Sequence, residues 1–338
     1  MLNFRNPPRW GRGAAEFYRD MIEEATLAEE LGYDHVWSSE HHFTEDQWTP
    51  TPLTVLAAIA ARTSRIRLGT CIAILPLNNP IRIAEDVATV DLISGGRLDF
   101  GVGPGISVKE FNTFGVPRKQ RKARMYEGLE ILRRCFTEDQ FSFKGKYYDF
   151  PDVRMTLKPV QKPFPPLWVA AVGEKSLQQA ASAGYHLAGS GMVESQRIYD
   201  AALRQAGRNP DDYHIGQLRV FYLAENRDRA WDDIEEHLHY ELNWHRELFL
   251  EAADATLQKE LNLPELPPVG ELRKTGTGFF VPAIVGTPDD AIRMIEAYRS
   301  ETRVTHMVMW TQLPGLDPRK ARRSMELFAK YVIPQFRK

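Results

Sequence analysis

The chain has 338 residues, and its 43 basic and 45 acidic side chains give a formal net charge of −2 at pH 7. A balance so close to neutral lacks the positive charge that binds nucleic acid or an anionic membrane surface, so we expect neither as a partner. The longest apolar run has seven residues, from Val55 to Ala61, whereas a membrane-spanning helix needs about 18. Two cysteines are too few for a disulfide framework. Together these features predict a cytoplasmic protein of the size of an enzyme.

Apolar runs alternate with amphipathic segments along the whole chain. The spacing of apolar residues predicts helices at 13–31, 52–63, 80–93, 119–136, 175–183, 194–206 and 318–331. The runs between them predict strands at 34–39, 65–74, 96–102, 167–172, 186–188, 215–223 and 305–310, and residues 2–4 form an additional, very short strand. Strands that alternate with helices form a parallel sheet, and eight such units favour a closed (β/α)8 TIM barrel over an open doubly wound sheet. We therefore predict one barrel domain over residues 1–338.

Two segments are longer than the connections that a minimal barrel needs. Residues 138–162 alternate aromatic and polar side chains around Lys144-Gly145-Lys146, which predicts an inserted hairpin. Residues 232–282 are first helical and then rich in proline and glycine. An insertion of this length at the rim of a barrel is a candidate lid over the site.

The active residues of a barrel lie at the carboxyl ends of its strands, and four polar or glycine-rich segments of this chain follow strands. They are Glu40–Phe43, Thr70–Ile72, Gly103–Gly105 and Val172–Ser176. We expect all four on one rim. The basic run from Arg118 to Arg124 is interpreted instead as a solvated start of a helix.

The adjacent histidines His41 and His42 stand out among these segments. A histidine at this position can act as a general base or donate a hydrogen bond to a developing oxyanion, or it can serve only a structural hydrogen bond. Adjacent residues of an extended segment point to opposite sides, and neither an HExxH nor a CxxC motif occurs, so we expect no catalytic metal. Cys71 ends an apolar strand, and we interpret it as a buried thiol rather than a nucleophile.

The segment Val172–Ser176 turns from a strand into a helix. Free N–H groups, a positive helix end and the hydroxyl of Ser176 would suit a phosphate, although Ser176 could equally be only a helix cap. Glycines from Gly101 to Gly105 let the backbone approach a flat ligand. They do not form the GxGxxG pattern of a dinucleotide site.

The motifs and their order resemble those of the luciferase-like monooxygenases, the flavin-dependent barrel family that includes bacterial luciferase. The segments that carry the resemblance are 30–37, 40–44, 68–76, 79–86, 91–103, 285–288 and 325–336. The resemblance implies a monooxygenase that takes reduced FMN from a separate flavin reductase and uses O2 to oxygenate a small organic substrate, such as an aldehyde. It also implies a homodimer that pairs through the helices at 52–63 and 80–93.

The resemblance implies site residues as well. His41 matches the catalytic histidine, and Cys71–Ile72 matches the position of a non-proline cis peptide bond beneath the flavin ring. Positions that match flavin contacts are Thr70, Cys71, Ile72, Gly103, Ile106, Val172, Gly173 and Ser176.

The chain departs from the pattern in two places. Gly103 and Pro104 stand where bacterial luciferase has a cysteine and an arginine; the glycine is expected to leave room near the flavin, and the loss of the arginine leaves a phosphate partner unassigned. The family's first strand begins about five residues before the position of Leu2, so at about 3.3 Å per residue we expect a shortened strand and an incomplete barrel floor. We therefore expect the chain to start downstream of the natural start.

Three other functions remain compatible with the sequence. Some relatives on the same barrel use a deazaflavin cofactor for hydride transfer without oxygen. A flavin-binding protein without turnover would follow if the short strand or the missing arginine disables the site. A metal-dependent barrel hydrolase is the third alternative.

Overall fold

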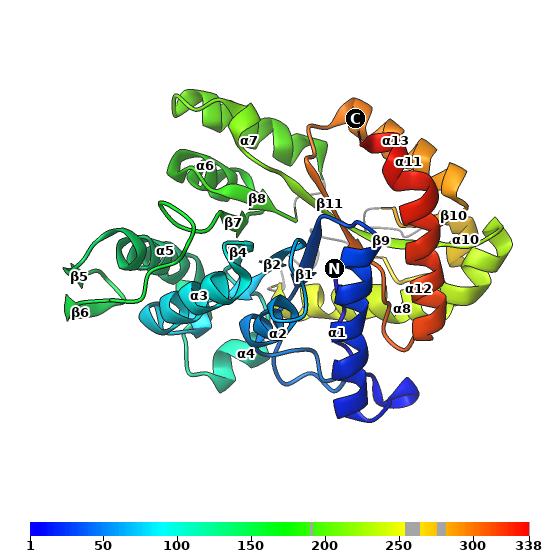
Figure 1. Ribbon diagram of the computed structural model, residues 1–338, viewed down its shortest axis with the longest axis horizontal. Coiled ribbons are helices and arrows are strands. Elements are labelled where there is room, and N and C mark those ends of the chain that lie inside the picture. Colours follow the sequence, from blue (N-terminus) through cyan, green and yellow to red (C-terminus); the bar gives the residue numbers. More distant parts are fainter. Residues whose placement is uncertain (190–191, 254–263, 276–281, 338) are drawn as a thin grey trace.

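Parallel strands form the centre of the fold and helices surround them (Figure 1). This computed structural model describes residues 1–189, 192–253, 264–275 and 282–337. One sheet has the order β1-β2-β4-β7-β8, with β3 beside β4, and another has the order β10-β9-β11; every neighbouring pair in both is parallel. The strands are β1 (His35–Ser38), β2 (Arg67–Thr70), β3 (Ala73–Ile74), β4 (Leu98–Gly103), β7 (Leu167–Ala170), β8 (His186–Ala188), β9 (Gly216–Leu223), β10 (Ile284–Gly286) and β11 (His306–Trp310).

Hydrogen bonds join the two sheets into a ring. A parallel bridge between Leu187 and Ile215 connects β8 to the start of β9. On the other side, the N–H of Leu2 donates to the carbonyl of Trp37 at 2.9 Å, and the amino group of Met1 bonds to the carbonyl of Met309. Residues 1–4 thus lie between β1 and β11 and take the place of the first strand. The predicted (β/α)8 architecture is confirmed.

The helices follow the expected alternation. They are α1 (Ala14–Glu30), α2 (Pro52–Ala60), α3 (Pro80–Ser94), α4 (Val108–Thr113), α5 (Arg121–Thr137), α6 (Glu174–Ala183), α7 (Val193–Gln205), α8 (Arg227–Ala252), α10 (Leu272–Thr275), α11 (Pro288–Glu301), α12 (Pro318–Leu327) and α13 (Ile333–Phe336). Local sequence sets their ends. The side chain of Asn79, for example, accepts hydrogen bonds from the first turn of α3, and Gly95 ends that helix in the left-handed region with φ of 64°.

Two expectations about the elements were wrong or incomplete. The single strand predicted over 65–74 is two short strands, β2 and β3, separated by a cis peptide bond between Cys71 and Ile72. The helix α11 was not predicted, although Thr287 and Asp290 form a capping box around Pro288 at its start. That capping box was the signal that could have identified it.

The interior of the barrel is filled by large side chains. Trp37 and Trp168 meet edge to face there, with ring centroids 5.3 Å apart. Gly69 on β2 makes this possible, because a Cβ atom at that position would lie 2.3 Å from the ring of Trp37. The larger apolar core lies between the strands and the surrounding helices and includes Phe100, Leu68, Val169 and Leu129.

The two long segments are partly described. Within 138–162, β5 (Phe141–Lys144) and β6 (Asp149–Val153) pair as an antiparallel hairpin that lies at the left edge of Figure 1. Within 232–282, most of the helical part belongs to α8, which begins earlier, at Arg227. Residues 254–263 and 276–281 of the candidate lid lie outside the described residues, and the lid stays a prediction.

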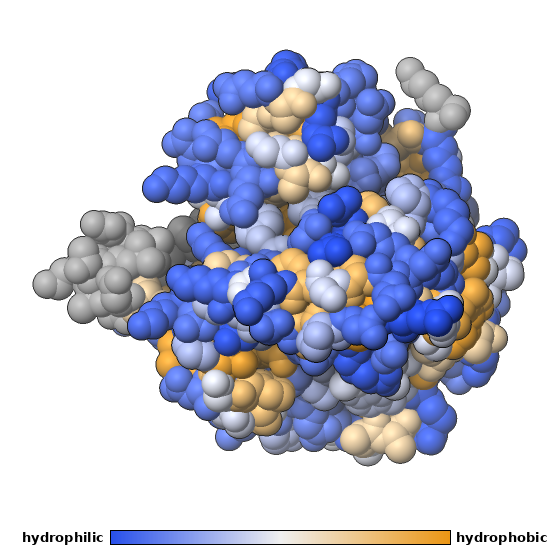
Figure 2. All heavy atoms as spheres, turned by 90° about the vertical axis from the view of Figure 1, so that its left-hand side faces the viewer, coloured by the Kyte–Doolittle hydropathy of each residue, from blue (hydrophilic) through white to orange (hydrophobic). Residues whose placement is uncertain are grey.

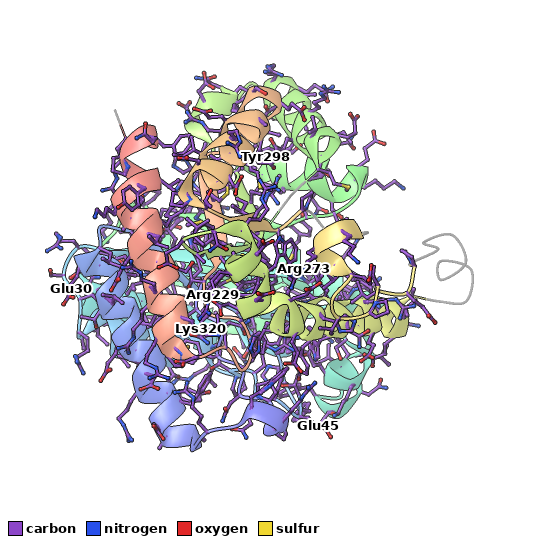
Figure 3. The ribbon with its side chains drawn as sticks, turned by 90° about the vertical axis from the view of Figure 1, so that its right-hand side faces the viewer. Glu30, Glu45, Arg229, Arg273, Tyr298 and Lys320 are labelled. Atoms are coloured by element: carbon purple, nitrogen blue, oxygen red, sulfur yellow. The ribbon has the colours of Figure 1, made fainter. Side chains whose placement is uncertain are left out.

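Ion pairs tie α8 to the outer helices. The carboxylate of Asp233 on α8 forms ion pairs with Lys320 of α12 at 2.6 Å and with Arg229 of α8 itself at 3.1 Å. It also accepts a hydrogen bond from the hydroxyl of Tyr222 at 3.1 Å. Figure 3 shows Arg229 and Lys320 close together on this side of the molecule. None of the described helices combines the length and the apolar composition needed to cross a lipid bilayer.

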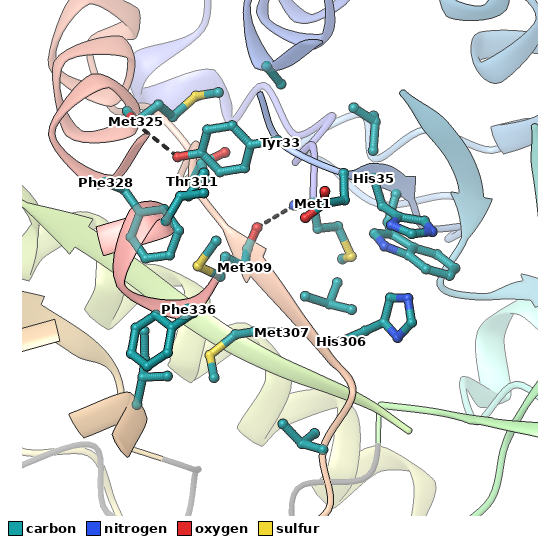
Figure 4. Close-up of a pocket in the computed structure, with 18 of the residues that line it drawn as sticks. Met1, Tyr33, His35, His306, Met307, Met309, Thr311, Met325, Phe328 and Phe336 are labelled. Atoms are coloured by element: carbon teal, nitrogen blue, oxygen red, sulfur yellow. Dashed lines mark hydrogen bonds between the residues drawn. The ribbon is translucent and has the colours of Figure 1, made fainter. Parts of the chain in front are cut away.

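A cavity of about 660 Å3 opens at the floor, between the starts of β1 and β11. Figure 4 shows Met1, His35, Met307 and Met309 around it, with the bond from the Met1 amino group to the Met309 carbonyl. Burial lowers the pKa of that amino group to about 5. Alternate residues of a strand turn their backbone N–H and C=O groups to the same edge. The backbone groups of Trp37 and Met309 face residues 1 and 2. The backbone groups of His35 and Met307, two positions earlier in the same strands, therefore face the cavity. The cavity thus lies between the two strands, beside residues 1 and 2.

Four histidines gather at the same end of the barrel. His35, His186 and His306 begin β1, β8 and β11, and His214 precedes β9. Successive ring centroids lie 4.8–4.9 Å apart, and Trp168 packs against three of the rings. Burial, with the neighbouring histidines as a further cause, lowers the pKa of His186 to about 4 and that of His306 to about 3. These two rings are therefore neutral at pH 7.

Candidate functional site

The loop after β1 carries His41, and a carboxylate holds its ring in place. Nδ1 of His41 lies 2.9 Å from Oε1 of Glu110, and the backbone N–H of His42 donates to the same oxygen at 2.8 Å. Glu110 belongs to α4 and is 1% exposed; the hydroxyl of Ser107, the cap of that helix, accepts its backbone N–H at 3.3 Å. One buried carboxylate oxygen thus fixes both the imidazole and the loop that carries it.

The two adjacent histidines have different partners. Nε2 of His42 lies 2.8 Å from Oε1 of Glu40, and the other oxygen of Glu40 accepts the backbone N–H of Ile74 at 2.9 Å. His42 and Glu40 thereby connect the loop to β3, directly after the cis peptide bond. Of the two interpretations given to the pair, the structural one fits His42, and His41 is the histidine that a catalytic role would use.

The cis peptide bond expected between Cys71 and Ile72 is present. Thr70, just before it, is fully buried, and its hydroxyl donates to the carbonyl of Gly101 at 2.6 Å and accepts the N–H of Gly101 at 2.9 Å. Cys71 is half-buried and not fully buried as expected; desolvation raises the pKa of its thiol to about 11, which favours the protonated thiol at neutral pH. This state agrees with a free thiol and not with a nucleophile.

The structure corrects one expectation about Gly103. A Cβ atom at Gly103 would lie 2.7 Å from Cδ1 of Ile72, so the side chain of Ile72 occupies the room that the glycine leaves. Ile106, in the loop that follows, offers its carbonyl to Nε of Arg118 at 2.8 Å. Nη2 of the same arginine donates to the carbonyl of Ala252 at 2.6 Å, which connects this loop to the end of α8.

The start of α6 is open, and the positive end of the helix dipole lies there beside one acidic side chain, Glu174, in the first turn. Its cap is Gly173, with φ of 82°, and nothing lies within 4 Å of a Cβ atom built there. The hydroxyl of Ser176 does not cap the helix, and it lies 3.2 Å from Nζ of Lys122 on α5. The neighbouring Val172 is 76% exposed, which is unusual for an apolar side chain at the end of a barrel strand. A helix end with free N–H groups, a hydroxyl and an ammonium group suits a phosphate.

Two residues of this rim were missed by reasoning from the sequence. Glu110 is 69 residues from His41 in the chain, and the signal for it was the Ser107-x-x-Glu110 capping pattern after the fourth strand. Lys122 lies in the basic run 118–124, which was interpreted as a solvated helix start. The spacing of residues in the sequence could not show that Lys122 faces the loop after β7, the fifth strand of the barrel.

Aromatic rings and a buried ion network support His41 from the other side. Its ring centroid lies 4.5 Å from that of Trp48 and 4.9 Å from that of Trp244 on α8. The guanidinium of Arg5 lies over both tryptophans, at 4.3 Å and 4.7 Å. Arg5 has two carboxylate partners at 2.6 Å each, Asp46 and Glu241. Across the described ranges, no three His, Cys, Asp or Glu side chains are placed so that they could hold a metal ion.

Known proteins are similar in sequence to this chain over much of its length. An uncharacterised protein y4vJ of Sinorhizobium fredii is 32% identical over 222 residues, which are 64% of this chain and 63% of that protein. The oxygenase component of a flavin-dependent trigonelline monooxygenase of Acinetobacter baylyi is 24% identical over 95% of the chain and 90% of its own length. An F420-dependent glucose-6-phosphate dehydrogenase of Amycolatopsis mediterranei is 27% identical over 94% and 95%.

Solved structures of monooxygenases are also similar to this chain. The monooxygenase RslO1 of Streptomyces bottropensis superimposes with a TM-score of 0.83 and 27% identity, over 99% of this chain and 98% of its own. The oxygenating constituent of 3,6-diketocamphane monooxygenase of Pseudomonas putida, in complex with FMN, has a TM-score of 0.79 and 21% identity over 98% and 96%, which shows the fold. A sequence profile described as luciferase-like monooxygenase matches residues 1–306. The chain therefore belongs to the luciferase-like monooxygenase family.

Proposed function

We propose that this chain is the oxygenase component of a two-component monooxygenase, which takes reduced FMN from a separate flavin reductase and uses O2 to oxygenate a small organic substrate. The observation that carries the proposal is the pairing of Lys122 with Ser176 at the open start of α6. Bacterial luciferase has an arginine at the position of Pro104, and proline carries no charge. Lys122 supplies a positive charge in its place.

FMN fits the residues of this rim. The phosphate would lie against the first turn of α6, with Gly173, Ser176 and Lys122 as its partners. The flat ring would lie over the Cys71–Ile72 bond and beside the loop of Ile106, and Thr70 would hold β2 to β4 beneath it. Val172, which follows β7 and is 76% exposed, and Met192, the N-cap residue of α7, which is 60% exposed, would be covered by the bound cofactor.

Reduced FMN supplies the activation of O2 and the transfer of one oxygen atom to the substrate. The chain has to position the reacting groups, exclude water and move protons. Because Nδ1 of His41 faces Glu110, Nε2 is the nitrogen that can donate a hydrogen bond to the reacting atoms or take a proton from them. The carboxylate of Glu110 stabilises the imidazolium when His41 holds that proton.

The partners proposed for the chain are a flavin reductase, a small organic substrate with O2, and a second copy of the chain. Pairing of α2 and α3 with those of another protomer is supported by Leu92 and Ile93 near the end of α3, which are 41% and 48% exposed. The face that carries α3 shows hydrophobic patches among hydrophilic residues (Figure 2). We propose a cytoplasmic location because the reduced flavin has to come from a reductase in the same compartment.

A deazaflavin-dependent dehydrogenase is the second candidate. It is favoured by the F420-dependent dehydrogenase that is 27% identical over 94% of the chain. This enzyme would use the same barrel for hydride transfer and would not consume O2.

Anaerobic titration with photoreduced FMN, followed by rapid mixing with oxygenated buffer, tests the proposal. Tight binding and a transient absorbance that differs from those of reduced and oxidised FMN support an oxygenase. Weak binding of FMN, with tight binding of F420, would replace it by the dehydrogenase. Tight binding of FMN with no transient would instead indicate a flavin-binding protein without turnover.

A further inference from the structure

Arg5 follows the short strand formed by residues 1–4, and its side chain is fully buried near the rim. Its guanidinium pairs with Asp46, in the segment after β1, and with Glu241 on α8, at 2.6 Å in each case. Both carboxylates are buried as well, with exposed fractions of 1% and 0%. One cation therefore holds together three segments that are far apart in the chain.

The charge balance of this network does not favour stability by itself. Two buried carboxylates face one guanidinium, and the attraction between buried ions offsets only part of the free energy lost when they leave water. Apolar side chains of similar volume often fill such a space with equal or greater stability. The hydroxyl of Tyr240 donates to Asp46 at 3.2 Å and the amide of Asn3 to Glu241 at 3.3 Å, so both carboxylates are fixed in direction. What the network provides is a defined position for the guanidinium.

Two tryptophans connect this guanidinium to His41. The guanidinium carbon of Arg5 lies over the rings of Trp48 and Trp244, at 4.3 Å and 4.7 Å from their centroids. The same two rings contact the imidazole of His41, at 4.5 Å and 4.9 Å, with interplanar angles of 68° and 71°. Nε1 of Trp48 donates to the hydroxyl of Ser39 at 2.8 Å. Within the described ranges the indole N–H of Trp244 forms no hydrogen bond, so ring contacts and the guanidinium hold that side chain.

The imidazole of His41 depends on these rings for its orientation. In the described part of the chain its one hydrogen bond joins Nδ1 to Oε1 of Glu110 at 2.9 Å. A single hydrogen bond leaves a ring free to turn about the line between the two atoms. Contacts with two further rings remove that freedom, and a cation over an aromatic face holds the ring more strongly where water is excluded.

We infer that Arg5 is a positioning residue for His41 and acts through the two tryptophans that hold the imidazole. The inference deepens the monooxygenase proposed above and rests on it for the reaction. The same contacts fix the wall of a pocket of about 460 Å3 beside His41, which Tyr240 and Trp244 line. A guanidinium suits this role because its planar fork can pair with two carboxylates and stack on rings at the same time.

Nuclear magnetic resonance of the flavin-free protein, with isotope-labelled histidine rings, tests the inference without turnover. The ring C–H signals of His41, assigned by their loss in His41→Gln, are displaced by the ring currents of the two indoles. Arg5→Met should reduce this displacement by about half or more, because Trp244 can then turn into the pocket. Arg5→Lys should restore only part of it, since an ammonium group cannot pair with both carboxylates and stack on both rings. An unchanged displacement in folded Arg5→Met would overturn the inference.

A compensated variant covers the case in which Arg5→Met does not fold, since that change leaves two buried carboxylates without a cation. Arg5→Met combined with Asp46→Asn and Glu241→Gln removes all three charges and keeps the side chains close to their volumes. We expect its melting temperature to stay within about 5 °C of that of the unaltered protein. The displacement of the His41 signals should nevertheless fall as in Arg5→Met. Signals identical to those of the unaltered protein would overturn the inference.

Arg303→Met is the matched control. Arg303 precedes β11 at the opposite end of the barrel and pairs with Asp200 at 2.6 Å. Its loss should lower the melting temperature and leave the signals of His41 in place. A change of these signals as large as that in Arg5→Met would assign the effect to general loss of stability and would also overturn the inference.

Turnover separates the role of Arg5 from the reaction itself. With FMN and oxygen, the compensated variant should release more hydrogen peroxide for each FMN oxidised, as expected for His41→Ala. If the oxygen experiment fails and the His41 signals still move, the monooxygenase proposal is lost and the positioning of the imidazole stands. If the oxygen experiment succeeds and the signals do not move, the role of Arg5 is lost and the monooxygenase stands.

Discussion

The imidazole of His41 and the carboxylate of Glu110 meet at 2.9 Å, although one follows the second strand of the barrel and the other belongs to a short helix after the fourth. The contact brings the proposed proton carrier and the residue that orients its ring together from two separate loops. Several measurable consequences depend on it and on the other contacts of the rim and the floor.

Replacing His41 by alanine should leave FMN affinity within about twofold, because the ring is not a phosphate partner. Loss of a general acid or base typically lowers a rate by about 100-fold or more. We therefore expect less product and more hydrogen peroxide for each FMN oxidised. His42→Ala is the comparison, since His42 contacts Glu40 and not Glu110. Equal peroxide yields in His41→Ala and the unaltered protein would remove His41 from the mechanism.

Glu110→Gln should reproduce most of the defect of His41→Ala, because the amide keeps the shape of the side chain and loses its charge. Residues that act through one another are not additive, so the double variant should be hardly worse than His41→Ala alone. The measurement is peroxide yield for the two single variants and the double variant. Losses that multiply would show that Glu110 acts by a route that does not include His41.

Ser176→Ala and Lys122→Ala should both weaken FMN, by about 1–3 kcal/mol for the loss of a hydrogen bond to a charged group. The loss in Lys122→Ala should shrink as ionic strength rises. Riboflavin, which lacks the phosphate, is the control ligand, and Lys119→Ala is the control variant. If riboflavin affinity falls as much as FMN affinity, these residues do not bind the phosphate.

The histidines at the floor make stability depend on pH. The pKa values of His186 and His306 are lowered from 6.5 to about 4 and about 3. The unfolded chain therefore binds more protons than the folded one in this range, so their contribution to stability is present above pH 6.5 and is lost as the pH falls toward 4. We expect the melting temperature to fall over this pH interval, and to fall less in His306→Gln than in the unaltered protein. The difference should be about 2–4 °C for each kcal/mol that His306 contributes to the pH dependence of stability. A pH dependence identical in the two proteins would exclude His306 as a source.

Filling the cavity at the floor should stabilise the barrel. An engineered extension of about five residues in front of Met1, with alternating apolar side chains, would reach past His35 and Met307 and pair with both. It would also replace the buried amino group of Met1 by a peptide bond. We expect a higher melting temperature, measured by calorimetry. An extension of equal length with proline at alternate positions is the control, since proline cannot donate to the neighbouring strands; a gain from that extension too would contradict strand pairing.

Much of the fold followed from the sequence because apolar runs and helical periodicity are local signals. The eight barrel segments occur in the predicted order, including residues 1–4. The break of the third strand at Cys71–Ile72 could not be inferred from periodicity, because a cis bond does not change which residues are apolar. Its position came only from the resemblance to known proteins.

Fewer features of the candidate site than of the fold could be predicted from the sequence, for a physical reason. His41 and the start of α6 could be predicted as site residues because each lies at the end of a strand. Glu110 and Lys122 act by contact with residues 69 and 54 positions away in the chain, and no local pattern reports such a distance. The two carboxylates that pair with Arg5 come from two other segments of the chain and are recognisable as its partners only in space.

Arg118 connects the loop of Ile106 to the last turn of α8 through two carbonyl oxygens. The loop belongs to the proposed flavin site, and α8 supplies Trp244 and part of the wall of the pocket beside His41. A single guanidinium thus ties the loop of Ile106 directly to the end of α8. Amide hydrogen exchange in the loop and at the end of α8 should therefore slow down together when FMN binds, and Arg118→Ala should let the two segments exchange independently.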